Sequence, residues 1–335
     1  MKPKASILLL TYNQESLVRN AALSCLNQDY ESVEIIFSDD HSTDGTFAIL
    51  KEIAQSYTGP HEIKVRQNSK NSGIGPHYNQ AIAASSGDII ITAAGDDISE
   101  PTRVSQLVEG WESAGRKPDL ISSHFTIIDS SGKKWDRVET HDLGRASLSS
   151  WTEGHPFTVG ATHAFTRRLV DEYGPLGDDV WYEDPVFLLR ALMSGGAMTV
   201  PEPLVHYRVG GSSQQPAFKS SATLKRWHGT QSKRILAGIT QMLTDASKKG
   251  HRDIVGNTLS KQRQKEEYIA AMVALTSVAG RFKVFAVASD LSSGWKFRKL
   301  LTFSFPHFAV GIKKLKSRAR RPRKFIGNTD VSLIQ

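Results

Sequence analysis

The sequence predicts an α/β protein with a mostly parallel, Rossmann-like sheet flanked by helices, followed by a helical C-terminal extension. Strand-length runs rich in β-branched residues alternate with helical periodicity through the first hundred residues. Repeated strand–helix units with short connections are typical of a parallel sheet covered on both faces. Two acidic pairs, Asp39-Asp40 and Asp96-Asp97, each close such a run. Beyond residue 217 the strand signals stop and long helical segments follow.

The first hundred residues supply four expected strands and the helices between them. Short apolar runs predict the strands, and apolar residues at helical spacing predict the helices. The strands are expected at residues 6–10, 34–38, 62–67 and 87–92, and the helices at 14–26, 46–57 and 76–85.

The pattern loosens from Pro101 onward, where a second group of elements is expected. These are helices at 102–114 and 185–193 and extended segments at 120–129, 158–166, 198–200 and 204–209. The stretch 210–216 is rich in Gly, Ser and Gln, which predicts a domain boundary. We therefore expect a first domain over 1–216, a helical extension over 217–312 with helices at 222–246 and 253–280, and a basic tail over 313–335.

Composition indicates an ordinary soluble globular chain, with 39% hydrophobic and 23% charged residues. Cys25 is the single cysteine, so no internal disulfide requires an oxidising compartment. The formal net charge is +8, but residues 313–324 contain eight cations and no anion, so the rest of the chain is formally neutral. No run reaches the roughly 18 uninterrupted apolar residues of a membrane-spanning helix, and the apolar stretch at the start is too short for a secretory signal.

The two acidic pairs are the strongest functional signal. Carboxylates at the carboxyl ends of parallel strands lie at the crevice where open α/β sheets bind ligands. Two such pairs in one crevice could hold a nucleotide by its base and a divalent cation by its phosphates, which indicates a nucleotide-using enzyme. Two purely structural alternatives remain. Asp39-Asp40 could form a turn with Asx hydrogen bonds, and Asp96-Asp97 could be an N-cap for the helix near Pro101.

Five ordered motifs over roughly the first 215 residues resemble family 2 glycosyltransferases. They are Ala5–Asn13 with Gln28-Asp29-Tyr30, Ser38–Thr46, Asn71-Ser72-Gly73 with Gly87-Asp88, Gly95-Asp96-Asp97 before Pro101, and Glu183-Asp184 with Pro201–Arg208. The resemblance implies the type-A nucleotide-sugar-binding fold and makes residues 1–216 the catalytic domain. It covers none of the C-terminal third, in which no motif is assigned.

The resemblance also implies roles for nucleotide-binding residues. Asp40 would accept the imide N–H of uracil or thymine, with Thr11 and Tyr12 flanking the base and Tyr12 stacking on it. Arg208 would lie near the phosphates, where a positive fork stabilises the leaving diphosphate. The remaining nucleotide-binding candidates are Asn13, Gly73 and Gly95.

Asp96 matches the family's metal-contacting aspartate, and Asp97 is the second candidate ligand for Mn²⁺ or Mg²⁺, hard cations that prefer oxygen ligands. The usual first aspartate of the motif is replaced by Ala94. Asp184 would be the base that takes the proton of the incoming hydroxyl, with Glu183 as a supporting carboxylate. Asp184 followed by Pro185 is also the signature of a helix N-cap.

The resulting prediction is a metal-dependent, inverting hexosyltransferase that moves a sugar from a UDP- or dTDP-sugar to an acceptor hydroxyl. The resemblance suggests synthesis of bacterial surface polysaccharide or a lipid-linked glycan, in the cytoplasm at the inner membrane face. The basic C-terminal segment would bind anionic lipid rather than nucleic acid. One alternative is a non-catalytic nucleotide-sugar-binding or membrane scaffold protein. A nucleotidyltransferase is disfavoured because no Gly-rich basic loop follows the first strand.

Overall fold

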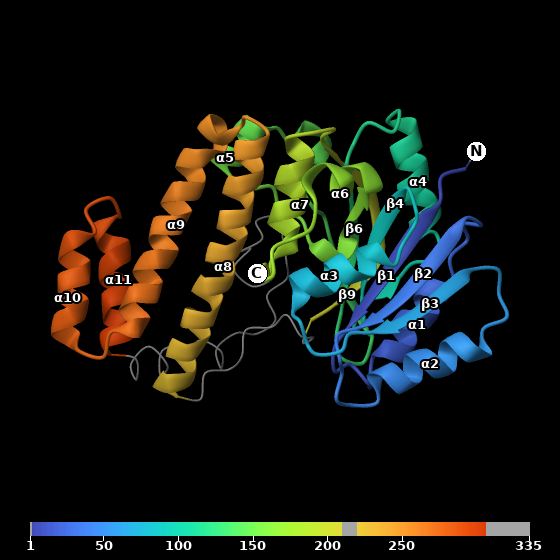
Figure 1. Ribbon diagram of the computed structural model, residues 1–335, viewed down its shortest axis with the longest axis horizontal. Coiled ribbons are helices and arrows are strands. Elements are labelled where there is room, and N and C mark those ends of the chain that lie inside the picture. The colour runs from blue at the N-terminus through green and yellow to red at the C-terminus, as the bar shows by residue number, and fades with distance from the viewer. Residues whose placement is uncertain (1, 210–219, 306–335) are drawn as a thin grey trace.

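A nine-stranded mixed sheet forms the centre of the molecule, in the strand order β3-β2-β1-β4-β8-β6-β9-β5 with β7 paired to β6. The computed structural model describes residues 2–209 and 220–305, shown in Figure 1. The predicted boundary at 210–216 and the basic tail at 313–335 therefore lie outside the described residues, and the division into domains stays a prediction.

Four parallel strands carry the acidic pairs to one edge of the sheet. They are β1 (Ala5–Thr11), β2 (Val33–Asp39), β3 (Glu62–Gln67) and β4 (Ile89–Ala94). Strand β1 pairs in parallel with β2 and β4, with Thr11 opposite Asp39 and Leu10 opposite Ala94. The predicted strands are thus confirmed, and the residues that follow them lie side by side.

Helices cover both faces of this parallel half: α1 (Val18–Leu26), α2 (Thr46–Ser56), α3 (Ile74–Ala83) and α4 (Arg103–Ser113). Alternate residues of β1 point to opposite faces, so Ile7 and Leu9 share a core with α1, α2 and α4, while Leu8 packs with α3. Helix α1 begins at Val18, later than predicted, because Asn13 adopts a φ of 51° and the Gln14 N–H donates to the Thr46 hydroxyl.

The second half of the sheet is less regular than predicted. Its elements are β5 (Ile98–Ser99), β6 (Leu120–Ile128), β7 (Lys134–Val138), α5 (Leu148–Glu153), β8 (Ala164–Thr166), α6 (Arg167–Tyr173), α7 (Glu183–Leu192) and β9 (Ala197–Arg208). The strand expected at 158–166 is confined to β8, because residues Gly160–Thr162 form a 3₁₀ turn. The two strands expected after 197 are one strand, β9, whose register against β6 shifts beside Pro203.

Four helices make up the described part of the C-terminal extension: α8 (Ser221–Lys248), α9 (Arg252–Ala274), α10 (Val278–Val287) and α11 (Ser293–Ser304). Helix α8 runs beside α7, and α9 packs on α8, as Figure 1 shows. The helix expected at 253–280 is broken after Ala274, and the Ser277 side chain caps α10 by accepting from the Gly280 N–H. Among the described residues, no helix is long and apolar enough to cross a bilayer.

A buried ion pair joins α8 to the rest of the molecule. The Arg190 Nε on α7 lies 2.7 Å from an Asp245 carboxylate oxygen on α8, and both side chains are 1% exposed. Arg190 also donates to the carbonyl of Gly174. Removing one partner of such a pair leaves an uncompensated buried charge, which is strongly destabilising. Helix α8 is therefore fixed against α7, the helix that begins with Glu183-Asp184.

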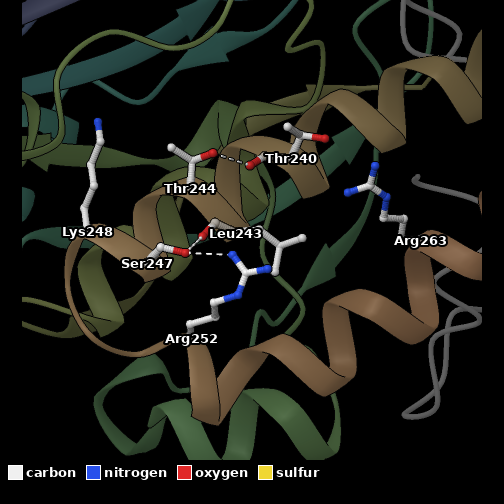
Figure 2. Close-up of a pocket in the computed structure, with 7 residues that line it drawn as sticks. All are labelled: Thr240, Leu243, Thr244, Ser247, Lys248, Arg252 and Arg263. Atoms are coloured by element: carbon white, nitrogen blue, oxygen red, sulfur yellow. Dashed lines mark hydrogen bonds between the residues drawn. The ribbon is translucent and has the colours of Figure 1, made fainter.

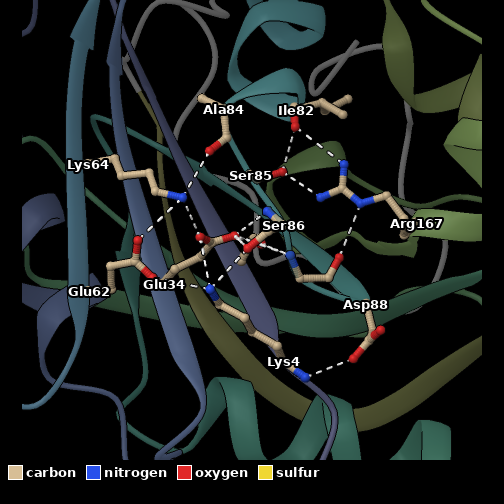
Figure 3. Close-up of polar contacts among 12 residues, drawn as sticks. Lys4, Glu34, Glu62, Lys64, Ile82, Ala84, Ser85, Ser86, Asp88 and Arg167 are labelled. Atoms are coloured by element: carbon tan, nitrogen blue, oxygen red, sulfur yellow. Dashed lines mark hydrogen bonds and ion pairs between the residues drawn. The ribbon is translucent and has the colours of Figure 1, made fainter.

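A second buried charge lies where β1, β2 and β3 begin, at the end of the sheet away from the acidic pairs. Figure 3 shows the Glu34 carboxylate among Lys4, Lys64 and Ser86. Burial raises the pKa of Glu34, but hydrogen bonds from Ser6, Lys64 and Ser86 outweigh it and lower the pKa to about 2. Glu34 therefore stays ionised near neutral pH and joins these strands at their amino-terminal ends. We assign this cluster to stability rather than to function.

Candidate active site

Asp40 organises the loop that follows β3. Its Oδ1 accepts from the Asn68 amide at 2.6 Å and from the N–H and the hydroxyl of Ser72, each at 2.9 Å. Its Oδ2 accepts from the Gly73 N–H at 2.9 Å. Burial raises the pKa of Asp40, but the bonds from Ser72 and Asn68 outweigh it, so the net pKa is below its ordinary value. Asp40 is therefore held as a carboxylate, and Oδ2 keeps room for a further donor.

Asp39 has a structural role, as the turn interpretation of this pair suggests. It is fully buried and accepts from the hydroxyl of Thr11, from the N–H and hydroxyl of Ser42, and from the amide of Gln67. The Thr11 side chain is buried in the same network, so contact with a base would involve its backbone. The Asn13 side chain is also engaged, accepting from the N–H of Thr43.

Tyr12 and Gly95 lie in the loops that follow β1 and β4. The Tyr12 side chain is 43% exposed, which leaves its ring accessible for stacking on a base. Gly95 lies so close to β1 that an added Cβ would come within 2.3 Å of the Gln14 side chain and 2.7 Å of Thr11. A side chain at this position would therefore push apart the loops that follow β1 and β4.

Asp96 and Asp97 follow β4 and are tied to the end of β9. The Arg208 N–H donates to the Asp97 carboxylate at 2.8 Å, and the Arg208 guanidinium donates to the backbone carbonyls of Asp96 and Asp129 at 2.8 and 2.6 Å. Burial, followed by the neighbouring Asp96 carboxylate, raises the pKa of Asp97 well above its ordinary value. Arg208 therefore fixes the loop that carries Asp96, and its contact with phosphate stays a prediction. Asp97 does not cap α4, whose N-cap is Thr102.

Among the described residues, no group of three or more His, Cys, Asp or Glu side chains could hold a metal by itself. This does not conflict with a Mg²⁺ or Mn²⁺ site, because such ions are commonly held by one or two carboxylates together with substrate phosphates and water. The oxygen donors Asp96 and Asp97 fit that kind of site, in which the substrate supplies the remaining ligands.

Glu183 and Asp184 form a carboxyl pair in the first turn of α7. The N-cap of α7 is Tyr182, so the N-cap interpretation of Asp184 is wrong. Asp184 instead accepts from the Gly160 N–H at 2.8 Å. Burial and the neighbouring Asp184 carboxylate raise the pKa of Glu183 well above its ordinary value. The raised pKa favours the protonated form of Glu183 beside Asp184.

Two buried side chains that the sequence did not single out as site residues support this pair. The Tyr78 hydroxyl donates to Thr92 at 3.0 Å and lies beside Glu183. His163 is 2% exposed, its ring contacts the Thr158 hydroxyl, and burial lowers its pKa to about 4. His163 is therefore a neutral hydrogen-bonding side chain near Asp184, in line with a structural or acceptor-lining role. No spacing in the sequence identifies either residue.

Short chains of contacts join Asp40, Asp96 and Asp184 at the carboxyl ends of the parallel strands, here called the acidic edge. The Asp40 N–H donates to the Thr11 carbonyl, and the Gly95 N–H donates to the Leu10 carbonyl, so the loops carrying Asp40 and Asp96 meet above β1. Trp181, three residues before Asp184, lies against Gly73, whose N–H is bound to Asp40. The edge therefore brings these positions together, although their individual roles stay predictions.

Helix α8 also reaches this edge. Tyr182 donates from its hydroxyl to Gln231, and the Arg234 guanidinium lies 3.5 Å from the centre of a Trp181 ring. The Gly177 N–H donates to Gln241 at 3.0 Å. The segment that leads into Glu183-Asp184 is thus held by α8, part of the predicted extension.

Two cavities between described residues have none of Asp40, Asp96 and Asp184 in their lining. Figure 2 shows one of about 370 Å³ between α8 and α9, lined by Thr240, Leu243, Thr244, Ser247, Lys248, Arg252 and Arg263. Its three hydroxyls each donate to a carbonyl of α8. The other, of about 590 Å³, lies against α1 and β5. The candidate site is defined by the contacts around Asp40, Asp96 and Asp184.

A mostly parallel sheet with acidic side chains beyond the carboxyl ends of its strands defines an α/β fold of the class that binds ligands at that end. The chain belongs to glycosyl transferase family 2, whose family model matches residues 6–174, just over half of its length. It is 25% identical over 233 residues to an uncharacterized glycosyltransferase of Nostoc sp., covering 66% of this chain and 69% of that protein. It is 24% identical over 225 residues to the succinoglycan biosynthesis protein ExoO of Rhizobium meliloti, covering 63% of each chain.

Solved structures show the same fold at low sequence identity. One is TarS 1-349 of S. aureus in complex with UDP, with a TM-score of 0.58 and 15% identity, covering 97% of this chain and 94% of that one. Another is the mannosyltransferase PcManGT of Pyrobaculum calidifontis in complex with GDP-Man and Mn²⁺, with a TM-score of 0.55 and 15% identity, covering 95% and 88%. The predicted fold class, the type-A glycosyltransferase fold with a helical C-terminal region, is thereby confirmed.

Proposed function

We propose that the protein is an inverting glycosyltransferase that moves a hexose from a UDP- or dTDP-sugar to an acceptor hydroxyl. The observation that carries this proposal is the geometry at the start of α7, where Asp184 lies beside Glu183 and accepts from the Gly160 N–H at 2.8 Å. An inverting transfer needs one base at the acceptor hydroxyl, and Asp184 is the carboxylate available for it.

The donor is bound at the ends of β1 and β2. Asp40 Oδ2 accepts the imide N–H of a uracil or thymine base, and Tyr12 stacks on the ring. Gly73 and Gly95 allow close packing against Trp181 and against Thr11 and Gln14, and Asn13 holds the loop after β1 against Thr43. The neighbour that binds UDP supports this donor class, while the neighbour that binds GDP-Man shows that the fold alone does not select the base.

Asp96 is the residue that would hold a divalent cation, with Asp97 beside it and Arg208 fixing their loop. When bound, Mn²⁺ or Mg²⁺ would neutralise charge on the departing diphosphate. The neighbour solved with Mn²⁺ supports a metal of this kind. Ala94 in place of the motif's first aspartate removes one oxygen ligand, so the affinity for the metal is expected to depend on the bound diphosphate.

Turnover tests this function directly. The purified chain is incubated with UDP- and dTDP-sugars, a panel of glycan and lipid-linked acceptors, and either Mn²⁺ or EDTA, and release of nucleoside diphosphate is measured. We expect release that EDTA abolishes and that Asp96→Ala lowers about 100-fold, with inversion at the anomeric carbon seen by NMR. Undiminished release from Asp96→Ala would show the metal assignment to be wrong. Tight UDP binding without turnover across the panel would favour the non-catalytic scaffold.

The similar proteins suggest a biological role for this transferase. ExoO is named for succinoglycan biosynthesis, which supports a role in bacterial surface polysaccharide or lipid-linked glycan synthesis at the inner face of the membrane. Helix α11 supports binding to that surface, because Phe297, Leu301 and Phe305 recur every four residues and are 42–50% exposed, beside Arg298 and Lys299. Apolar side chains next to cations suit a surface of anionic lipid.

Co-sedimentation with vesicles tests the membrane proposal. The full chain is expected to pellet with vesicles that contain phosphatidylglycerol, and to do so less at high salt. With vesicles of pure phosphatidylcholine it is expected to stay in the supernatant. Replacing Phe297 and Leu301 together by Ser should reduce binding about tenfold if α11 contributes. Equal binding to both kinds of vesicle, or none to either, would count against a peripheral membrane protein.

A further inference from the structure

Helix α8 presents a polar stripe to the segment that leads into the carboxyl pair. Residues 231, 234, 238, 241 and 245 follow helical spacing on one face. Gln231 binds the Tyr182 hydroxyl, Gln241 binds the Gly177 N–H, and Asp245 pairs with Arg190. Each of these three side chains therefore has a polar partner within the protein.

Arg234 differs from these neighbours, because its charge has no carboxylate partner among the described residues. Its guanidinium stacks on Trp181 and is hydrogen-bonded to the Tyr182 hydroxyl. Glu266 of α9 is close enough to act on Tyr182, but no ion pair joins it to Arg234 in the described part of the chain.

Within the described ranges Arg234 is a half-buried cation with no carboxylate partner, and a cation in that position loses hydration without gaining an ion pair. Stacking on an indole offsets part of that cost and holds the guanidinium flat on one face. Its N–H groups project in its plane, so those that do not bind Tyr182 remain for a ligand. A planar fork of this kind matches the oxygens of a phosphate.

The location of Arg234 points to the same kind of ligand. Trp181 lies between the loop of Gly73 and Arg234, and Gly73 is bound to Asp40. Asp184 follows three residues after Trp181. Through its contact with Trp181, Arg234 therefore lies next to the acidic edge. Trp181 links it to the segment of the proposed base and to the proposed nucleotide loop.

We propose that Arg234, stacked on Trp181, is a phosphate-binding residue of the active site, contributed by the C-terminal extension. The phosphate belongs either to the donor diphosphate or to a phosphorylated acceptor. The inference rests on the proposed nucleotide-sugar transferase function for the identity of the ligands. Its experiment measures binding, so it can succeed or fail independently of turnover.

The donor is tested with UDP and uridine, which share a base and differ in the diphosphate. Both are titrated into the wild-type chain and into Arg234→Gln and Arg234→Lys by calorimetry with Mn²⁺ present. If Arg234 binds the donor diphosphate, Arg234→Gln weakens UDP about tenfold or more, leaves uridine unchanged, and is partly rescued by Arg234→Lys. A purely structural role would weaken both ligands alike.

The acceptor is tested with inorganic pyrophosphate titrated into the chain saturated with UDP. If Arg234 serves an acceptor phosphate, the wild type binds pyrophosphate under these conditions and Arg234→Gln binds it at least tenfold more weakly, while UDP affinity is unchanged. Arg263→Gln is the matched control, because Arg263 is an exposed arginine of α9 paired with Glu267. The proposal is overturned if Arg234→Gln matches the wild type for UDP, uridine and pyrophosphate, or loses all three equally.

Discussion

Asp184→Asn is expected to lower the turnover number for sugar transfer by about 10³-fold while changing UDP affinity less than about threefold. The substitution keeps the size of the side chain and an oxygen that accepts from the Gly160 N–H, so the start of α7 should stay in place. It removes the carboxylate that takes the acceptor proton, a role that contributes on the order of 10²–10⁴ in rate.

Initial rates with saturating donor and acceptor, together with UDP titration, measure this effect. Glu183→Gln is the matched comparison, since burial and Asp184 keep Glu183 protonated and a glutamine retains a donor group beside Asp184. It should cost about tenfold. If Glu183→Gln lost as much activity as Asp184→Asn, or if Asp184→Asn retained activity within tenfold, Asp184 would not be the base.

The parallel half of the fold was predictable because its signals are local. Each of the first four strands is a short apolar run, and the carboxylates that follow β2 and β4 reach one edge by the rules of parallel pairing. The nearly continuous burial of β1 and β2 is what a sheet covered on both faces requires. Here the predicted strands are all present, although β4 is displaced by two residues and α1 begins later than predicted.

The second half depends on tertiary contacts that no local pattern reports. Strand β9 was predicted as two strands because Pro201 and Pro203 interrupt the apolar pattern, yet pairing with β6 continues through register shifts. Gly160 carries no sequence signal at all. Its importance comes from Asp184, because a Cβ added at Gly160 would lie 2.1 Å from the Asp184 carboxylate.

The contribution of α8 was missed for a different reason. Polar residues at helical spacing, as Gln231, Arg234 and Gln241 are, usually indicate a helix face exposed to solvent. The structure instead turns this face toward the segment 177–182, where each residue contacts a backbone group or an aromatic side chain. A polar stripe is informative only once the surface opposite it is known.

Base selection gives the second large effect. Asp40→Asn is expected to weaken UDP binding about 100-fold and to remove most of the preference of the wild type for UDP over CDP. A carboxylate accepts the imide N–H of uracil, whereas cytosine presents a ring nitrogen lone pair in that place and is repelled. Both Asp40 oxygens accept N–H groups from the loop at 68–73. In the variant one of these oxygens is replaced by an NH₂ group, which cannot accept those hydrogen bonds.

Ser72→Ala separates the two contributions to this effect. It removes one hydroxyl donor to Asp40 Oδ1 but leaves the Oδ2 side, which is bound to Gly73, unaltered. We expect it to weaken UDP and CDP together, by less than about tenfold, so that the ratio of their affinities is kept. Titration of UDP, CDP and GDP into the wild type and both variants gives that ratio directly. A wild type that binds all three nucleotides with the same affinity would contradict base recognition by Asp40. If both variants lost the same affinity for each nucleotide, Asp40 would only stabilise its loop.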